Sequence, residues 1–122
     1  MQTEKVIDYI VNWLKDYATK AGVKGYVIGV SGGVDSGVVS TLCAMTGLKV
    51  LALEMPIRQQ KDQASRALEH IDFLKNKFPN VEGFTVDLNE PFEALYKTFD
   101  VKDDEFPAEK LAFANTRSRL RM

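Results

Sequence analysis

Apolar residues follow two different spacings along this chain. Where they recur every three or four residues they predict helices, and where β-branched residues run together they predict buried strands. The predicted helices span residues 3–21, 38–45, 60–77, 90–99 and 108–122. The predicted strands span residues 25–30, 49–55 and 81–88.

Local signals set the ends of these elements. Thr3 is a candidate N-cap for the first helix, and Pro56 closes the second strand because it has no N–H to donate. Gly83 makes the third strand weaker than the other two. In the third helix the inward-facing positions are expected to be Ala64, Ala67, Leu68, Ile71 and Leu74.

The order of elements predicts the fold class. Strands joined by crossover helices form a parallel sheet, so we expect an α/β fold with helices on both faces. Three strands make a thin sheet for this architecture, and the last predicted helix runs to Met122 without a cap. We therefore interpret residues 1–122 as the N-terminal portion of a larger single domain.

Composition narrows the class of protein. The 122 residues are 45% hydrophobic and 27% charged, with a net charge of −1, which gives no argument for a nucleic acid or a membrane as a partner. Neither a signal peptide nor a membrane-spanning stretch is evident, so a cytoplasmic location is expected. The single cysteine, Cys43, excludes an internal disulfide and is interpreted as core filler.

A glycine-rich stretch, GVSGGVDS at residues 29–36, joins the first strand to the second helix. Glycines there let an anion approach free backbone N–H groups, and the helix N-terminus adds positive potential. This combination predicts a phosphate-binding loop. The candidate binding residues are Gly29, Val30, Ser31, Gly32, Gly33, Val34, Asp35 and Ser36.

Asp35 adds a further expectation. A carboxylate at a phosphate site repels the ligand unless a cation lies between them, so Asp35 predicts a bound Mg²⁺. The alternative is that Ser31 or Asp35 merely caps the helix while the glycines form a tight turn. Other titratable residues are interpreted as solvated, namely His70 and the acidic cluster of Asp100, Asp103, Asp104 and Glu105.

The loop resembles the pyrophosphate loop (PP-loop) of the N-type ATP pyrophosphatases, whose fold is adenine nucleotide alpha-hydrolase-like. This resemblance implies that ATP is cleaved between its α and β phosphates to form a substrate adenylate. LAFANTRSRLRM, at residues 111–122, is similar to a segment of the NAD synthetases in which the residue matching Arg119 contacts deamido-NAD. A solvated basic helix end is the alternative for this segment.

The resemblance to NAD synthetases implies an activity and partners. Ammonia would amidate deamido-NAD to NAD through an NAD-adenylate, with ATP as co-substrate, Mg²⁺ as cofactor and a homodimer as the assembly. Gln59 or Gln60 would lie near the adenine. The alternatives are a GMP synthetase, a tRNA-modifying thiolase and a nucleotide-binding module without activity.

Overall fold

The computed structural model describes residues 2–57, 61–98 and 115–122. Its elements are α1 (Thr3–Ala21), β1 (Gly25–Gly29), α2 (Val34–Met45), β2 (Lys49–Glu54), α3 (Lys61–Lys77), β3 (Val81–Thr85) and α4 (Asn89–Thr98). Residues 115–120 are also helical. The remainder of the predicted last helix, the acidic cluster at 100–105 and both candidate glutamines lie outside the described residues.

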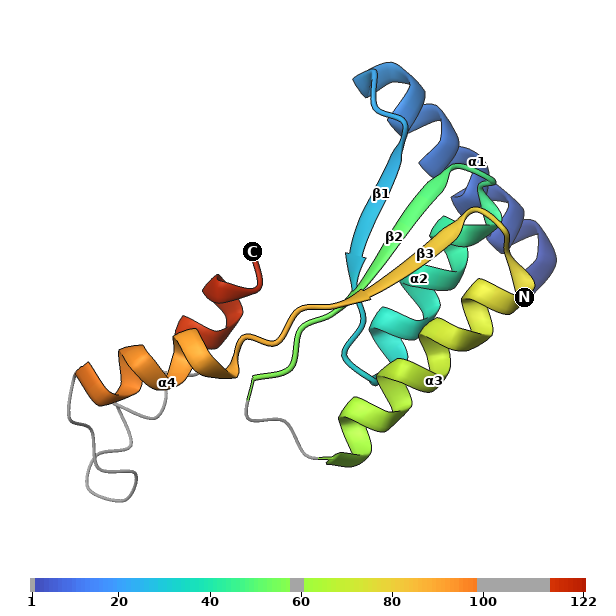
Figure 1. Ribbon diagram of the computed structural model, residues 1–122. Coiled ribbons are helices and arrows are strands. Elements are labelled where there is room, and N and C mark those ends of the chain that lie inside the picture. The colour runs from blue at the N-terminus through green and yellow to red at the C-terminus, as the bar shows by residue number, and fades with distance from the viewer. Residues whose placement is uncertain (1, 58–60, 99–114) are drawn as a thin grey trace.

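The three strands form one parallel sheet in the order β1-β2-β3. Gly25 pairs with Lys49, and Val50 pairs with Val81, so the strands start almost level. Each connection moves to the next strand in the same direction, and right-handed crossovers therefore bring α2 and α3 to the same face of the sheet (Figure 1). The predicted α/β class with a parallel sheet is confirmed.

The core lies between this sheet and its helices. Val50 and Ala52 of β2 are at most 1% exposed, and Ala67 and Leu74 of α3 are fully buried opposite them. Helix α1 packs beside α2 on the same side, as Figure 1 shows, so the described α1, α2 and α3 all lie on one face. Helices are expected on both faces of the sheet, whereas α1, α2 and α3 cover the same face.

The second face of the sheet carries apolar side chains that remain exposed in the described structure. Val27 of β1 is 66% exposed and Phe84 of β3 is 55% exposed. Side chains alternate between the faces of a strand, so these residues point away from the helices that cover Val50 and Ala52. Parallel sheets are normally covered on both faces.

Gly83 allows β3 and α3 to pack closely, which the sequence alone did not indicate. A Cβ at this position would overlap Cγ2 of Ile71 and come within 3.2 Å of Cδ of Lys75, both on α3. The missing side chain therefore lets α3 lie close to β3. The glycine that looked like a weakness in the strand is a condition for its contact with the helix.

Helix α2 begins at Val34 instead of residue 38, and other boundary and burial predictions also differ from the structure. Thr3 is the first helical residue rather than the cap, and Gln2 occupies the N-cap without a side-chain cap hydrogen bond. Strand β3 ends at Thr85 instead of residue 88, because Pro56 supplies only a carbonyl, which accepts from the Leu88 amide at 3.1 Å. Leu68 is 45% exposed, since the α3 contact face is narrow and follows Ala67, Ile71 and Leu74.

None of the described helices is both long enough and apolar enough to cross a bilayer.

Candidate functional site

The glycine-rich loop, residues 29–36, runs from the end of β1 into the first turn of α2 (Figure 1). Val30 is buried, and its amide donates to the carbonyl oxygen of Leu53 at 2.8 Å, which anchors the loop to β2. Gly33 is the N-cap of α2 and forms no side-chain cap hydrogen bond. By helix geometry the first-turn N–H groups that follow it have no intrahelical acceptor, and they carry the positive end of the helix dipole. This is the arrangement that binds anions.

Hydrogen bonds to the hydroxyls of two serines, Ser31 and Ser36, connect residues within the loop. The amide of Ser31 donates to Oγ of Ser36 at 3.1 Å, and the two hydroxyl oxygens lie 3.1 Å apart. The amide of Gly33 donates to Oγ of Ser31 at 3.3 Å. The simple alternative, in which Ser31 or Asp35 caps the helix, is therefore not what the structure contains: Gly33 caps α2, and the serines hold the shape of the loop.

Gly32 is the position where this loop requires glycine. Its φ is +88°, a conformation that residues with a Cβ rarely adopt, and a Cβ there would overlap the backbone carbonyl oxygen of Gln63 at the start of α3. At Gly32 the backbone of the loop therefore lies directly against the backbone of α3.

Asp35 lies in the first turn of α2 with its side chain exposed. Among the described residues no group of three or more His, Cys, Asp or Glu side chains could hold a metal. Mg²⁺ at phosphate sites commonly takes only one or two protein carboxylates and completes its shell with phosphate oxygens and water. One exposed carboxylate beside an anion-binding turn fits that pattern, so Asp35 is suited to Mg²⁺ shared with a phosphate ligand.

A hollow lies at the carboxyl edge of the strands, where ligands of open α/β sheets bind. It measures about 260 Å³ and is lined by Gly29, Val30, Ser31, Leu53, Met55 and Arg121. Nε of Arg121 donates to the carbonyl oxygen of Met55 at 3.1 Å. Burial, and next the charge of Arg117, lower the pKa of Arg121. The hydrogen bond to Met55 holds the guanidinium of Arg121 beside the loop.

Sequence reasoning selected Arg119 from the C-terminal helical residues, whereas the structure brings Arg121 to the sheet edge. Arg119 is exposed and does not line this hollow. On a helix, Arg117 and Arg121 share one face and Arg119 lies on a roughly opposite one, but this spacing does not tell which face meets the sheet. The buried carboxylate of Glu54, which accepts from the Thr85 hydroxyl at 3.0 Å on the same edge, was likewise missed.

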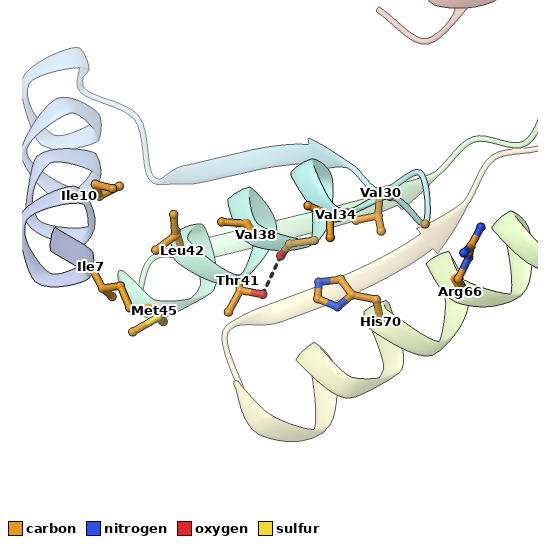
Figure 2. A pocket seen from close by; sticks show the side chains of 13 residues that line it. Ile7, Ile10, Val30, Val34, Val38, Thr41, Leu42, Met45, Arg66 and His70 are labelled. Carbon is orange, nitrogen blue, oxygen red and sulfur yellow. Dashed lines mark hydrogen bonds between the residues drawn. The ribbon is translucent and has the colours of Figure 1, made fainter. Parts of the chain in front are cut away.

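A larger groove, about 590 Å³, runs beside α2 and reaches the loop at Gly32 and Gly33. Figure 2 shows apolar side chains of α1 and α2 along it, with Arg66 and His70 extending from α3 toward α2. His70 is half-buried, and its Nε2 lies 2.9 Å from Oγ of Ser40. The interpretation of His70 as a solvated side chain was wrong, because the third helix faces α2 at this position.

Comparison with known proteins identifies the family of this chain. The family model described as NAD synthase matches residues 6–122. An NH(3)-dependent NAD(+) synthetase of Mesoplasma florum is 36% identical over 100% of this chain and 48% of its own length. The one from Carboxydothermus hydrogenoformans is 34% identical over 98% of this chain and 47% of its own length. The chain thus spans about half the length of the curated relatives it matches.

Solved structures give the same result. An NMN synthetase from Francisella tularensis superposes with a TM-score of 0.81 at 32% identity, covering 99% of this chain and 47% of that one. An NH3-dependent NAD synthetase from Campylobacter jejuni, in complex with nitrate, gives a TM-score of 0.80 at 26% identity, covering 100% of this chain and 49% of that one. The three-stranded sheet and its helices are thus shared with about half of each larger chain.

Proposed function

Since this chain belongs to the NAD synthase family, we propose that residues 1–122 are the N-terminal, ATP-binding portion of an ammonia-dependent NAD synthetase. Such an enzyme is a ligase that forms the amide C–N bond of NAD from deamido-NAD. The observation that carries the proposal is the glycine-rich loop, which ends in a helix N-terminus that lacks a side-chain cap.

The loop is proposed to hold the β and γ phosphates of ATP, which leave as pyrophosphate. First-turn amides of α2 would donate to phosphate oxygens as negative charge develops on the leaving group. Asp35 would hold Mg²⁺, and the ion when bound would neutralise part of that charge. Fixed donors need no reorganisation during the reaction, which is why a rigid loop favours catalysis.

No covalent nucleophile is needed in this proposal. The nicotinate carboxylate of the substrate attacks the α phosphate of ATP, pyrophosphate leaves, and ammonia then displaces AMP from the adenylate. Cys43 has no part in these steps, because it is buried and burial raises the pKa of its thiol, which keeps it protonated. The protein contributes position and electrostatics.

Arg119 is proposed to contact the pyridine nucleotide substrate. Its side chain is exposed and available to a ligand, and a guanidinium can bind phosphate or carboxylate in two-point fashion. A second candidate substrate follows from the similarity to an NMN synthetase, namely the mononucleotide acid that would give NMN. The same loop chemistry serves both substrates, so substrate length is the point to be tested.

For the complete protein we propose a cytoplasmic homodimer that uses free ammonia and binds neither nucleic acid nor membrane. The near-neutral charge of this portion favours small-molecule partners over polyanions.

The deciding experiment incubates the protein with ATP, Mg²⁺, ammonium and one acceptor at a time. Release of pyrophosphate together with NAD from deamido-NAD is the expected result. NMN from the mononucleotide acid would move the assignment to the second candidate, and amination of xanthylate would move it to a GMP synthetase. ATP binding without turnover would identify residues 1–122 as a nucleotide-binding portion that lacks the groups for chemistry.

A further inference from the structure

A chain of hydrogen bonds connects α3 to the glycine-rich loop through the first turns of α2. Nε2 of His70 lies 2.9 Å from Oγ of Ser40, which is fully buried. The Ser40 hydroxyl lies 2.6 Å from the carbonyl oxygen of Ser36 and 3.0 Å from that of Gly37. Ser36 in turn accepts the Ser31 amide on its own Oγ at 3.1 Å.

The direction of these bonds follows from the available hydrogens. A serine hydroxyl carries one hydrogen, and a carbonyl oxygen can only accept. The contact of 2.6 Å assigns the Ser40 hydrogen to the Ser36 carbonyl, so Oγ of Ser40 must accept from His70. Nε2 of His70 therefore carries a hydrogen. The neutral Nε2–H form and the imidazolium both satisfy this requirement, and no change of charge is involved.

The His70 ring has neighbours on both α2 and α3. Gly37 has no side chain on the surface that the ring approaches, and a Cβ there would lie 3.9 Å from Cε1 of His70. The ring also stacks on Phe73, with centroids 6.2 Å apart. The imidazole thus faces α2 at the turn directly behind the loop, within the groove of Figure 2.

We propose that His70 is a positioning residue for the phosphate-binding loop: by donating to Ser40 it fixes the hydroxyl that holds Ser36, and Ser36 fixes the Ser31 amide. This inference rests on the proposed function only for the identity of the ligand, since the bonds to the loop exist without one. His70 itself does not touch the ligand. It couples the orientation of α3 to the shape of the loop.

The test uses two substitutions that differ in one property. His70→Gln keeps an N–H donor at similar reach, whereas His70→Leu keeps bulk and removes the donor. In the ligand-free chain, the Ser31 amide should exchange with solvent about 2-fold to 10-fold faster in His70→Leu, the range expected for one lost hydrogen bond, and at the unchanged rate in His70→Gln. Ser40→Ala should give the same acceleration, and adding His70→Leu to it should have no further effect.

Phe73→Leu is the matched control, because it removes the ring stacked on His70 and leaves the donor. Its Ser31 amide should exchange at the unchanged rate. Equal acceleration in His70→Gln and His70→Leu would show that ring shape matters instead of the donor, and an unchanged rate in His70→Leu would exclude any coupling. Either result overturns the inference.

Calorimetry with Mg²⁺ and pyrophosphate separates this inference from the proposed function. The dissociation constant should rise by the same 2-fold to 10-fold factor in His70→Leu and be restored in His70→Gln. If the unchanged chain does not bind pyrophosphate, the proposed function fails, while the exchange rates still decide whether His70 positions the loop.

Discussion

Gly32 shows how much of the site depends on single residues. Its φ of +88° and the backbone carbonyl of Gln63 each exclude a side chain independently. Gly33, one residue later, has φ −87°, and a Cβ there would lie 3.4 Å from Oγ of Ser31, an ordinary contact. Two adjacent glycines that look equivalent in the sequence therefore have different roles.

The pair provides a matched substitution. Gly32→Ala should lower the free energy of unfolding by about 1–3 kcal/mol, the cost of a strained conformation, and should weaken pyrophosphate binding because the loop must move. Gly33→Ala should change stability much less. Thermal denaturation and calorimetry measure both effects, and equal losses in the two variants would contradict the assignment of strain to Gly32.

Asp35 predicts a metal-dependent effect with a definite sign. Asp35→Asn removes the charge that would hold Mg²⁺, so the dissociation constant for ATP in the presence of Mg²⁺ should rise at least about 10-fold. Without Mg²⁺ the same variant should bind ATP as well as the unchanged chain or better, because a repulsive carboxylate is gone. Calorimetry with and without Mg²⁺ checks the sign, and a loss in both conditions would argue for simple structural damage.

At the scale of elements, the sequence carried most of the information. Apolar periods located helices α1 to α4 and strands β1 to β3, and the glycine-rich run between β1 and α2 located the loop. The periodicity did not show which element packs against each face of a helix. Leu68 was expected inside and is exposed, and His70 was expected outside and contacts Ser40, because these outcomes depend on how α3 meets α2 and β3.

Two glycine substitutions test this contact between elements with opposite expected signs. Gly83→Ala should lower the free energy of unfolding by about 1–3 kcal/mol, because the new methyl group overlaps Ile71 and forces α3 off β3. Gly37→Ala should raise it by up to about 1 kcal/mol, because alanine favours the helix and the methyl group has room beside His70. Denaturant titration of the two variants gives both values. A gain in Gly83→Ala would contradict the close packing of α3.

At the scale of the whole molecule, contacts between distant segments complete the site. Arg121 donates to Met55, 66 positions earlier in the chain, and closes the hollow beside the loop. No local pattern predicts such a contact, since it depends on where the C-terminal helical residues return to the sheet. The resemblance in the sequence predicts a substrate contact from Arg119 in the same segment, and that role stays a prediction.

Replacing Arg121 tests the long-range contact. Arg121→Lys keeps the positive charge but loses the Nε–H that donates to Met55, so amides of residues 115–121 should exchange about 2-fold to 10-fold faster. Arg119→Lys is the control, because the exposed Arg119 side chain does not line the hollow. Equal exchange in the two variants would show that Arg121 does not hold this segment.

The start of α2 has no side-chain cap hydrogen bond, and this has a consequence for the stability of the protein without a ligand. An anion bound to the first-turn amides of α2 accepts the hydrogen bonds that a capping side chain would otherwise accept. Its binding free energy therefore adds to the stability of the folded state. At a concentration 100 times its dissociation constant, such a ligand would add about 2.7 kcal/mol to the folded state. Nucleotide would then stabilise the folded chain, and the melting temperature would rise with the logarithm of the nucleotide concentration above the dissociation constant.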